Sequence, residues 1–103
     1  MALELRPNCE YCDCDVPPES RDARICTFEC TFCADCVETN LHNVCPNCGG
    51  GFERRPIRTL REWRPGLSRL TRPPSTKRRQ LSFSKEDIAA FCESIRRIPP
   101  QDR

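Results

Sequence analysis

Cysteine is the residue that most limits how this 103-residue chain can fold, because nine of its ten cysteines lie between residues 9 and 48. Eight of these nine follow the spacing C-x2-C-x13-C-x3-C-x2-C-x2-C-x8-C-x2-C. In a C-x2-C pair a tight turn can direct two thiolates to one tetrahedral ion. Only 37% of the residues are hydrophobic, and that share includes the cysteines. A short chain with so few core residues needs metal, disulfides or oligomerisation to be stable.

The beginning of the chain helps to decide between metal and disulfides. The segment MALELRPN contains an acid at position 4 and lacks the apolar run of a secretory signal. No later segment is apolar over the length that spans a bilayer. We therefore expect a cytoplasmic protein without membrane contact, whose thiols stay reduced. Clustered cysteines in that setting more often hold metal, and a disulfide scaffold is the alternative.

Eight thiolates match two closed sites with four sulfur ligands each. A closed, soft sulfur set favours zinc, with iron as the second choice. Four protein ligands leave no open position for water or substrate, so we expect structural ions and no enzyme activity. The expected cofactor is two Zn²⁺ ions, and the expected ligands are Cys9, Cys12, Cys26, Cys30, Cys33, Cys36, Cys45 and Cys48.

These ligands can be paired in two ways. In a sequential arrangement the first four cysteines hold one ion and the last four hold the other. In an interleaved arrangement the first pair joins the third pair, and the second joins the fourth. The interleaved arrangement is favoured, because it gives each of the cysteines at positions 30, 33 and 36 a defined partner. The spacing alone leaves both arrangements open.

Two short elements are expected around the ligands in residues 1–52. Residues 24–29 alternate and include β-branched and aromatic residues, which predicts a short strand that contains Cys26. Residues 34–43 place Val37 and Leu41 four apart, which predicts a short helix. The chain should therefore begin with a small zinc-stabilised α+β head that contains a short hairpin and one short helix.

Three residues with reactive side chains remain outside the expected ligand set. Cys14 follows the first pair and is expected to be a free thiol near the metal, with a substitute ligand as the alternative. His42 is the only histidine and is expected on the helix surface. Cys92 is far from the array in sequence, so we expect a small core residue.

Charge divides the chain into two different halves. Residues 1–52 contain nine acids and three arginines, whereas residues 53–103 contain fourteen basic residues and six acids. Prolines at 56, 65, 73 and 74 predict that residues 53–83 form an extended, largely disordered basic linker. The linker could fold back on the acidic head, or it could bind nucleic acid. The candidate contacts to nucleic acid are Arg54, Arg55, Arg58, Arg61, Arg64, Lys77, Arg78 and Arg79.

Residues 84–103 are expected to form an amphipathic helix and a short tail. Ser84 can cap the helix, and Asp87 lies three residues later. An apolar stripe follows at the spacing of one helix face, and Pro99 and Pro100 end the helix. A lone helix of this length is marginal in water, so it needs a surface to pack on. That surface is either the head of the same chain or a partner, including a second copy of the chain.

The spacing of the eight cysteines resembles a RING-type cross-brace, with a helix around the third pair and Cys-Pro-x-Cys at the end. The segments MALELRPNCE, RICTFECTFCADC and CPNCGG more closely resemble a family of short, uncharacterised, cysteine-rich bacterial proteins, a domain of unknown function. Weaker resemblance extends to STKR and IPPQDR. The resemblance implies a RING-like or treble-clef head in a bacterial zinc-binding protein whose role has not been assigned.

Two features of the sequence and its source argue against transferring ubiquitin-ligase activity from the RING resemblance. Gly49 follows the last ligand, and no basic residue appears before Arg54, where active ligases often place one near the last ligand. A bacterial source would normally have no ubiquitin system. We therefore expect a non-enzymatic zinc-binding adaptor with a protein partner. The alternatives are a nucleic-acid binder, a thiol-based zinc or redox sensor and, last, a RING-type ligase.

Overall fold

A hairpin lies at the centre of the head. The computed structural model describes residues 2–103. Strands β1 (Ala23–Ile25) and β2 (Thr31–Cys33) pair antiparallel, and β3 (Glu53–Arg54) adds to the other side of β1. The expected strand over 24–29 is shorter than predicted and ends before Cys26. The chain turns there, because the Cys26 amide donates to the Cys30 carbonyl and the Glu29 amide donates to the Cys26 carbonyl.

The predicted short helix follows directly after β2. It consists of α1 (Ala34–Cys36) and a π-helical turn, η1 (Val37–Leu41). Cys33 caps its beginning, since the sulfur accepts a hydrogen bond from the Cys36 amide. The helix ends two residues earlier than the predicted position 43, because His42 and Asn43 adopt left-handed conformations that no helix can continue.

The core is small and is built largely around the cysteines. The rings of Phe32 and Phe52 meet edge to face with centroids 5.3 Å apart. Val16, Leu41 and Val44 are buried beside them. Six of the array cysteines belong to the same buried cluster, so the sulfur groups and the apolar core form one body: Cys9, Cys26, Cys30, Cys33, Cys36 and Cys45.

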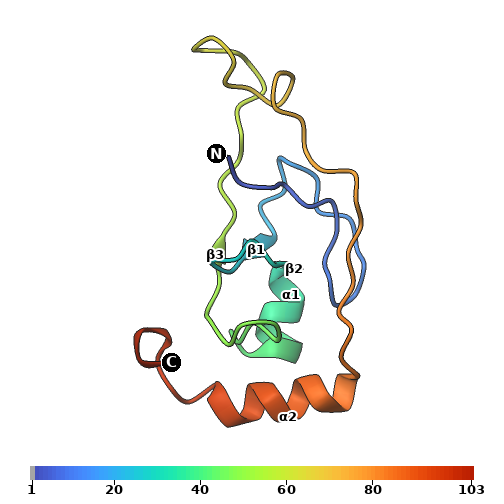
Figure 1. Cartoon of the computed structure of the whole chain (residues 1–103), viewed down its shortest axis with the longest axis vertical. Helices are drawn as coiled ribbons and strands as arrows, with labels where there is room; N and C mark the ends of the chain where they lie inside the picture. The colour runs from blue at the N-terminus through green and yellow to red at the C-terminus, as the bar shows by residue number, and fades with distance from the viewer. Residues whose placement is uncertain (1) are drawn as a thin grey trace.

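The predicted C-terminal helix is confirmed as α2 (Lys85–Ile95), with Ser84 as its cap. α2 lies across the end of the head (Figure 1), and it buries Ile88 and Cys92 in the shared core. The surface that covers its apolar stripe is therefore the head of the same chain. A short 3-10 turn, η2 (Pro100–Asp102), follows. None of the helices in the described part of the chain has the length and apolarity needed to cross a membrane.

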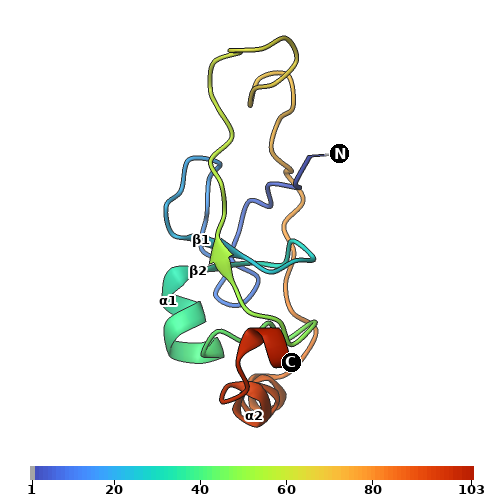
Figure 2. The ribbon, with the colours of Figure 1, turned by 90° about the vertical axis from the view of Figure 1, so that its left-hand side faces the viewer.

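The basic linker between β3 and α2 has no helix or strand within the described residues. It runs out to one end of the molecule and returns along the N-terminal segment (Figures 1 and 2). Ion pairs connect it to the acidic head, as the fold-back alternative predicts. They join Arg69 to Glu19, Arg78 to Asp13 and Asp15, and Arg79 to Glu4.

One arginine of the linker is fully buried. Arg55 follows β3, is 1% exposed and donates to the carbonyl oxygens of Arg6, Val16 and Pro17 at 2.8–2.9 Å. No carboxylate pairs with it among the described residues. Burial therefore lowers its pKa, and the nearby Arg58 lowers it further. Arg55 holds the start of the linker against two separate segments of the head.

Candidate metal centres

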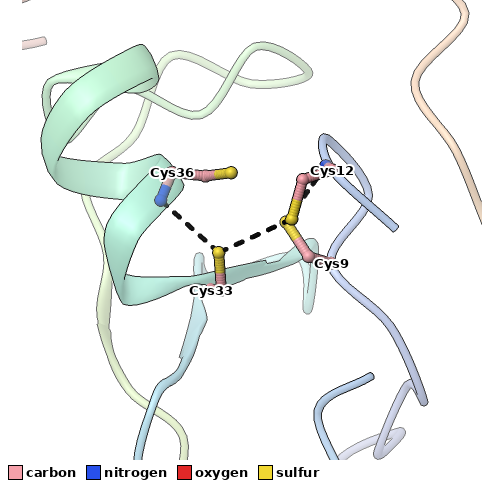
Figure 3. Close-up of side chains that lie close together, drawn as sticks. All are labelled: Cys9, Cys12, Cys33 and Cys36. Carbon is pink, nitrogen blue, oxygen red and sulfur yellow. Dashed lines mark hydrogen bonds between the residues drawn. The ribbon is translucent and has the colours of Figure 1, made fainter. Parts of the chain in front are cut away.

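The first sulfur group joins the N-terminal turn to the beginning of α1. Cys9 and Cys12 come from the turn, Cys33 ends β2 and Cys36 lies in α1 (Figure 3). Their four sulfurs all lie within 4.8 Å of one another, and the sulfurs of Cys12 and Cys33 are 3.8 Å apart. Residues more than twenty positions apart in sequence thus direct their thiols to one point.

Backbone amides donate hydrogen bonds to the sulfurs of this group. The Cys12 amide donates to the sulfur of Cys9 at 3.5 Å, and the Cys36 amide donates to the sulfur of Cys33 at 3.4 Å. The N-terminal turn closes because the Asp13 amide donates to the Cys9 carbonyl, with Asp13 at φ 66°. Amide donors of this kind stabilise negative charge on sulfur, which a site with four thiolates needs.

The second sulfur group joins the hairpin turn to the closing Cys-Pro-Asn-Cys segment. The sulfurs of Cys26, Cys45 and Cys48 all lie within 4.8 Å of one another. Cys30 is not in that set of three, but it interacts with the thiols of Cys26 and Cys45, since it contributes to raising the pKa of both. The side-chain amide of Asn47 also donates to the sulfur of Cys30, at 3.5 Å. Cys30 therefore lies beside the group, next to the closing segment that contains Asn47.

The thiols within each sulfur group differ in pKa, so some lose their proton more readily than others. A hydrogen bond from Cys45 is the main reason that the pKa of Cys30 falls to about 5, and the same bond raises the pKa of Cys45. Burial raises the pKa of Cys12, but hydrogen bonds from the Cys14 amide and neighbouring thiols outweigh it and bring the pKa to about 7. Burial is the main cause that raises the pKa of Cys36. An ion that takes all four sulfurs of a group displaces the remaining protons.

The grouping answers the question of pairing that the spacing left open. Sulfurs of the first and third pairs meet in one group, and sulfurs of the second and fourth pairs meet in the other. A tetrahedral ion with sulfur ligands at about 2.3 Å places those sulfurs about 3.8 Å apart. The first group has that spacing between Cys12 and Cys33. Both groups can therefore hold a metal ion, and both are built from soft sulfur donors.

The three remaining reactive side chains occupy different environments. Cys14 is exposed and lies outside the first group, and burial together with the thiols of Cys12 and Cys33 raises its pKa. His42 belongs to neither sulfur group and ends η1 in a left-handed conformation. Cys92 is on the buried face of α2, with its sulfur 3.7 Å from the carbonyl oxygen of Val44. The expectation of a core residue at position 92 is confirmed.

Two polar residues that support the groups carried no signal in the sequence. The buried carboxylate of Glu10 accepts from the Thr31 amide at 2.7 Å and from Arg6 at 3.0 Å. It therefore ties the N-terminal turn to β2, which brings Cys9 towards Cys33. Asn47 supports Cys30 in the second group. Their role depends on tertiary contacts, so neither spacing nor composition could have identified them.

Comparisons with known proteins agree with the resemblance of the sequence. A family model described as "Protein of unknown function (DUF1272)" matches residues 2–58, a range that contains both sulfur groups. The uncharacterized protein R02474 of Rhizobium meliloti (strain 1021) is 57% identical over 74 residues, which cover 69% of this chain and 88% of that protein. No match to a solved structure was found. The chain therefore belongs to the DUF1272 family of cysteine-rich proteins of unknown function.

Proposed function

We propose that the head binds two structural Zn²⁺ ions in a RING-like cross-brace and acts as a non-enzymatic interaction module in the cytoplasm. This proposal rests on one observation about residues 9–48. Sulfurs of the first and third cysteine pairs lie together in one group, and sulfurs of the second and fourth pairs lie together in the other. The proposed ligands of the first ion are Cys9, Cys12, Cys33 and Cys36. The proposed ligands of the second ion are Cys26, Cys30, Cys45 and Cys48.

Zinc suits these groups better than an ion that needs an open coordination site. Four thiolates complete a tetrahedron, so no position remains for a water that could attack a substrate. Binding energies on the order of 10 kcal/mol per ion are as large as the stability of a small domain. The ions therefore supply the folding energy that the small core of Phe32, Phe52 and a few aliphatic residues does not.

A protein partner is supported by the surface between the closing segment and α2. A largely apolar hollow there is lined by Pro46, Asn47, Phe83, Asp87, Ile88 and Phe91. Phe83 and Phe91 are exposed although they belong to an otherwise packed junction. Aromatic side chains at the edge of a hollow are typical anchors in protein interfaces. The proposal does not extend to ligase activity, because Gly49 and the residues up to Glu53 provide no basic side chain beside the last ligand.

The position of Cys14 favours a thiol sensor as a second candidate function. Its thiol is exposed and lies two residues after Cys12, and burial together with the thiols of Cys12 and Cys33 raises its pKa. Hydrogen peroxide can accept two electrons from the Cys14 thiol and the Cys12 thiolate, which with one proton from solvent forms one disulfide and two waters. That reaction removes a ligand from the first ion and leaves the second ion bound. A Cys14→Ser variant would then keep both ions under peroxide levels that release one ion from the unchanged chain.

Nucleic-acid binding is weakened as a candidate by the contacts of the linker. Arg55 is buried, and Arg58, Arg78 and Arg79 bond to the head. Among the described residues, four of the eight candidate side chains carry no ion pair or hydrogen bond, and these are Arg54, Arg61, Arg64 and Lys77. Fewer free cations mean fewer phosphate contacts and a shallower dependence of affinity on salt.

Native mass spectrometry of protein expressed with zinc tests the metal sites. We expect two zinc ions in the unchanged chain, and one of them held less tightly in each of the variants Cys30→Ser and Cys33→Ser. Cys92→Ser is the matched control, because this buried cysteine lies outside both groups. One ion or none in the unchanged chain, or equal loss in the control, would show that the proposed ligand sets are wrong.

A further inference from the structure

The end of the molecule opposite α2 is formed by residues 57–72, which we name the tip loop. Both ribbon views show this loop projecting beyond the head, with α2 at the other end of the long axis (Figures 1 and 2). The molecule measures 45 × 27 × 20 Å, so the two ends are well separated. The family model stops at residue 58, so the match leaves nearly all of this loop outside.

The tip loop buries one residue and leaves its large apolar side chains exposed. The buried residue is Ser68, which is 1% exposed and bonds through its amide and hydroxyl to the hydroxyl of Thr71. The Arg69 amide closes the loop on the Thr59 carbonyl at 2.8 Å. Trp63 is 72% exposed and Leu70 is 78% exposed, so neither side chain belongs to the core.

Exposed apolar side chains are concentrated in this loop. Ten large hydrophobic residues of the described chain are exposed, and five of them belong to the loop: Ile57, Leu60, Trp63, Leu67 and Leu70. Single exposed leucines are common on soluble proteins, whereas five large apolar side chains exposed within one short loop make that loop a candidate contact surface. The loop therefore has the composition of a binding site.

The tip loop is also positively charged. The loop contains five arginines and one acid, Glu62. Two of these arginines bind to the head. Arg58 donates to the Leu3 carbonyl at 2.7 Å, and Arg69 pairs with Glu19 at 3.0 Å. Arg61 and Arg64 flank Trp63, are exposed, and have no side-chain partner among the described residues. The free part of the loop is thus both apolar and cationic.

We propose that the tip loop binds the surface of an anionic lipid bilayer. Trp63, Leu60 and Leu67 enter the boundary between head groups and acyl chains, and Arg61 and Arg64 contact the lipid phosphates. Apolar side chains combined with cations are the requirement for binding in this region of a bilayer. A projecting loop can reach a bilayer without a matching cavity on the partner. This proposal departs from the expectation of no membrane contact. That expectation rested on the lack of a spanning segment, and the described residues 2–103 indeed contain no helix that could span a bilayer, which does not bear on contact at its surface.

Two further observations favour a bilayer over a nucleic acid. Bases stack on rings, and the loop offers one ring, Trp63, beside four aliphatic side chains that gain little from bases or phosphates. The acidic head would repel an anionic surface, but the elongated shape places the loop in front of it. Screening over about 10 Å at 0.1 M salt reduces the remaining repulsion.

The single tryptophan of the chain makes the test direct. The zinc-loaded full chain is mixed with vesicles of phosphatidylcholine that contain about a third of phosphatidylglycerol, and Trp63 emission and co-sedimentation are measured. We expect binding, a shift of the emission to shorter wavelength, and quenching by lipids brominated in the upper acyl chain. The protein should bind vesicles of phosphatidylcholine alone more weakly, by about fivefold for each free arginine that contacts the anionic lipid.

Variants separate the apolar contribution from the charge. Leu60→Ser with Leu67→Ser should reduce vesicle binding about tenfold for each leucine that is buried in the bilayer. Arg61→Gln with Arg64→Gln should reduce it about fivefold for each arginine. Phe28→Ser is the matched control, since Phe28 is a strongly exposed apolar residue of the head and should not affect binding. Zinc content is measured for every variant, so a failure of the metal sites is seen separately from a failure of this proposal.

Three results would overturn the proposal. Emission of Trp63 that does not change with anionic vesicles would exclude its entry into the bilayer. Binding that survives the double leucine change would show that the apolar side chains have no part in it. A single-stranded oligonucleotide that quenches Trp63 with an affinity unaffected by the leucine change would identify the loop as a nucleic-acid site instead.

Discussion

The linker and α2 both lie on the head, and they are attached to it in different ways. The linker is attached through polar contacts of Arg55, Arg69, Arg78 and Arg79. Backbone bonds add to these, since the Ser75 and Leu81 amides donate to carbonyls of the N-terminal segment. α2 is attached through the burial of apolar side chains, chiefly Ile88.

The comparison shows that the same small head holds the linker by polar contacts and α2 by apolar burial. Exposed ion pairs are weak and are screened by salt, whereas burial of apolar surface is insensitive to salt. The buried donor Arg55 lies between these extremes, because its hydrogen bonds are shielded from solvent. The linker and α2 should therefore respond differently to the same change of conditions.

Removal of metal should have the largest effect, because it acts on the surface that both segments share. Chelation of the proposed zinc removes binding energy on the order of 10 kcal/mol per ion, which exceeds the stability expected of this small core. We expect the backbone amides of α2 and of Ser75 and Leu81 to lose protection from hydrogen exchange together with the head. A chain that keeps its cooperative unfolding after chelation would contradict the proposed role of the ions.

Truncation of Ile88 should detach α2 selectively. Ile88 is buried against the head, and replacing such a residue with alanine costs about 3 kcal/mol. Ile88→Ala should lower helix content and the protection of α2 amides to the same extent in low and high salt, while linker amides change little. Leu70→Ala, which changes an exposed aliphatic residue, is the control. An equal effect of the control would show that burial is not the cause.

Replacement of Arg55 should loosen the beginning of the linker. Arg55→Gln leaves the buried carbonyl oxygens of Arg6 and Val16, and the partly buried one of Pro17, without their donor, which we expect to cost about 2 kcal/mol. The neighbouring Arg54→Gln provides the control, because Arg54 is exposed in β3. Denaturant unfolding measures both variants. If the two changes cost the same, the buried hydrogen bonds of Arg55 do not stabilise the fold.

Arg78→Gln should have the smallest effect, and that effect should depend on salt. Arg78 pairs with Asp13 and Asp15 at 2.9 and 2.6 Å, but all three side chains are well exposed to solvent. We expect faster hydrogen exchange at linker residues near position 79 in low salt, and no difference from the unchanged chain in 1 M salt. A difference that persists in high salt would mean that Arg78 contributes more than charge. Lys77→Gln, without a side-chain contact in the described chain, is the control.

Local features of the fold were predictable from sequence because they depend on residues close together in the chain. The cap at Ser84 and the apolar stripe of α2 require contacts across three or four positions, and the structure has both. The helix after Cys33 was predicted for the same reason. The strand before Cys26 was predicted too long, because alternation continues through a turn that backbone hydrogen bonds create.

The sequence by itself determined that soft donors occur as four close pairs, that a basic, proline-rich segment follows, and that an amphipathic helix ends the chain. Only the tertiary structure decided which pairs meet, since Cys9 and Cys33 come together through the bond between Glu10 and Thr31 and not through spacing. It also decided that Arg55 is buried while the leucines of the tip loop are exposed. Such choices depend on contacts between distant residues, and local pattern carries no information about them.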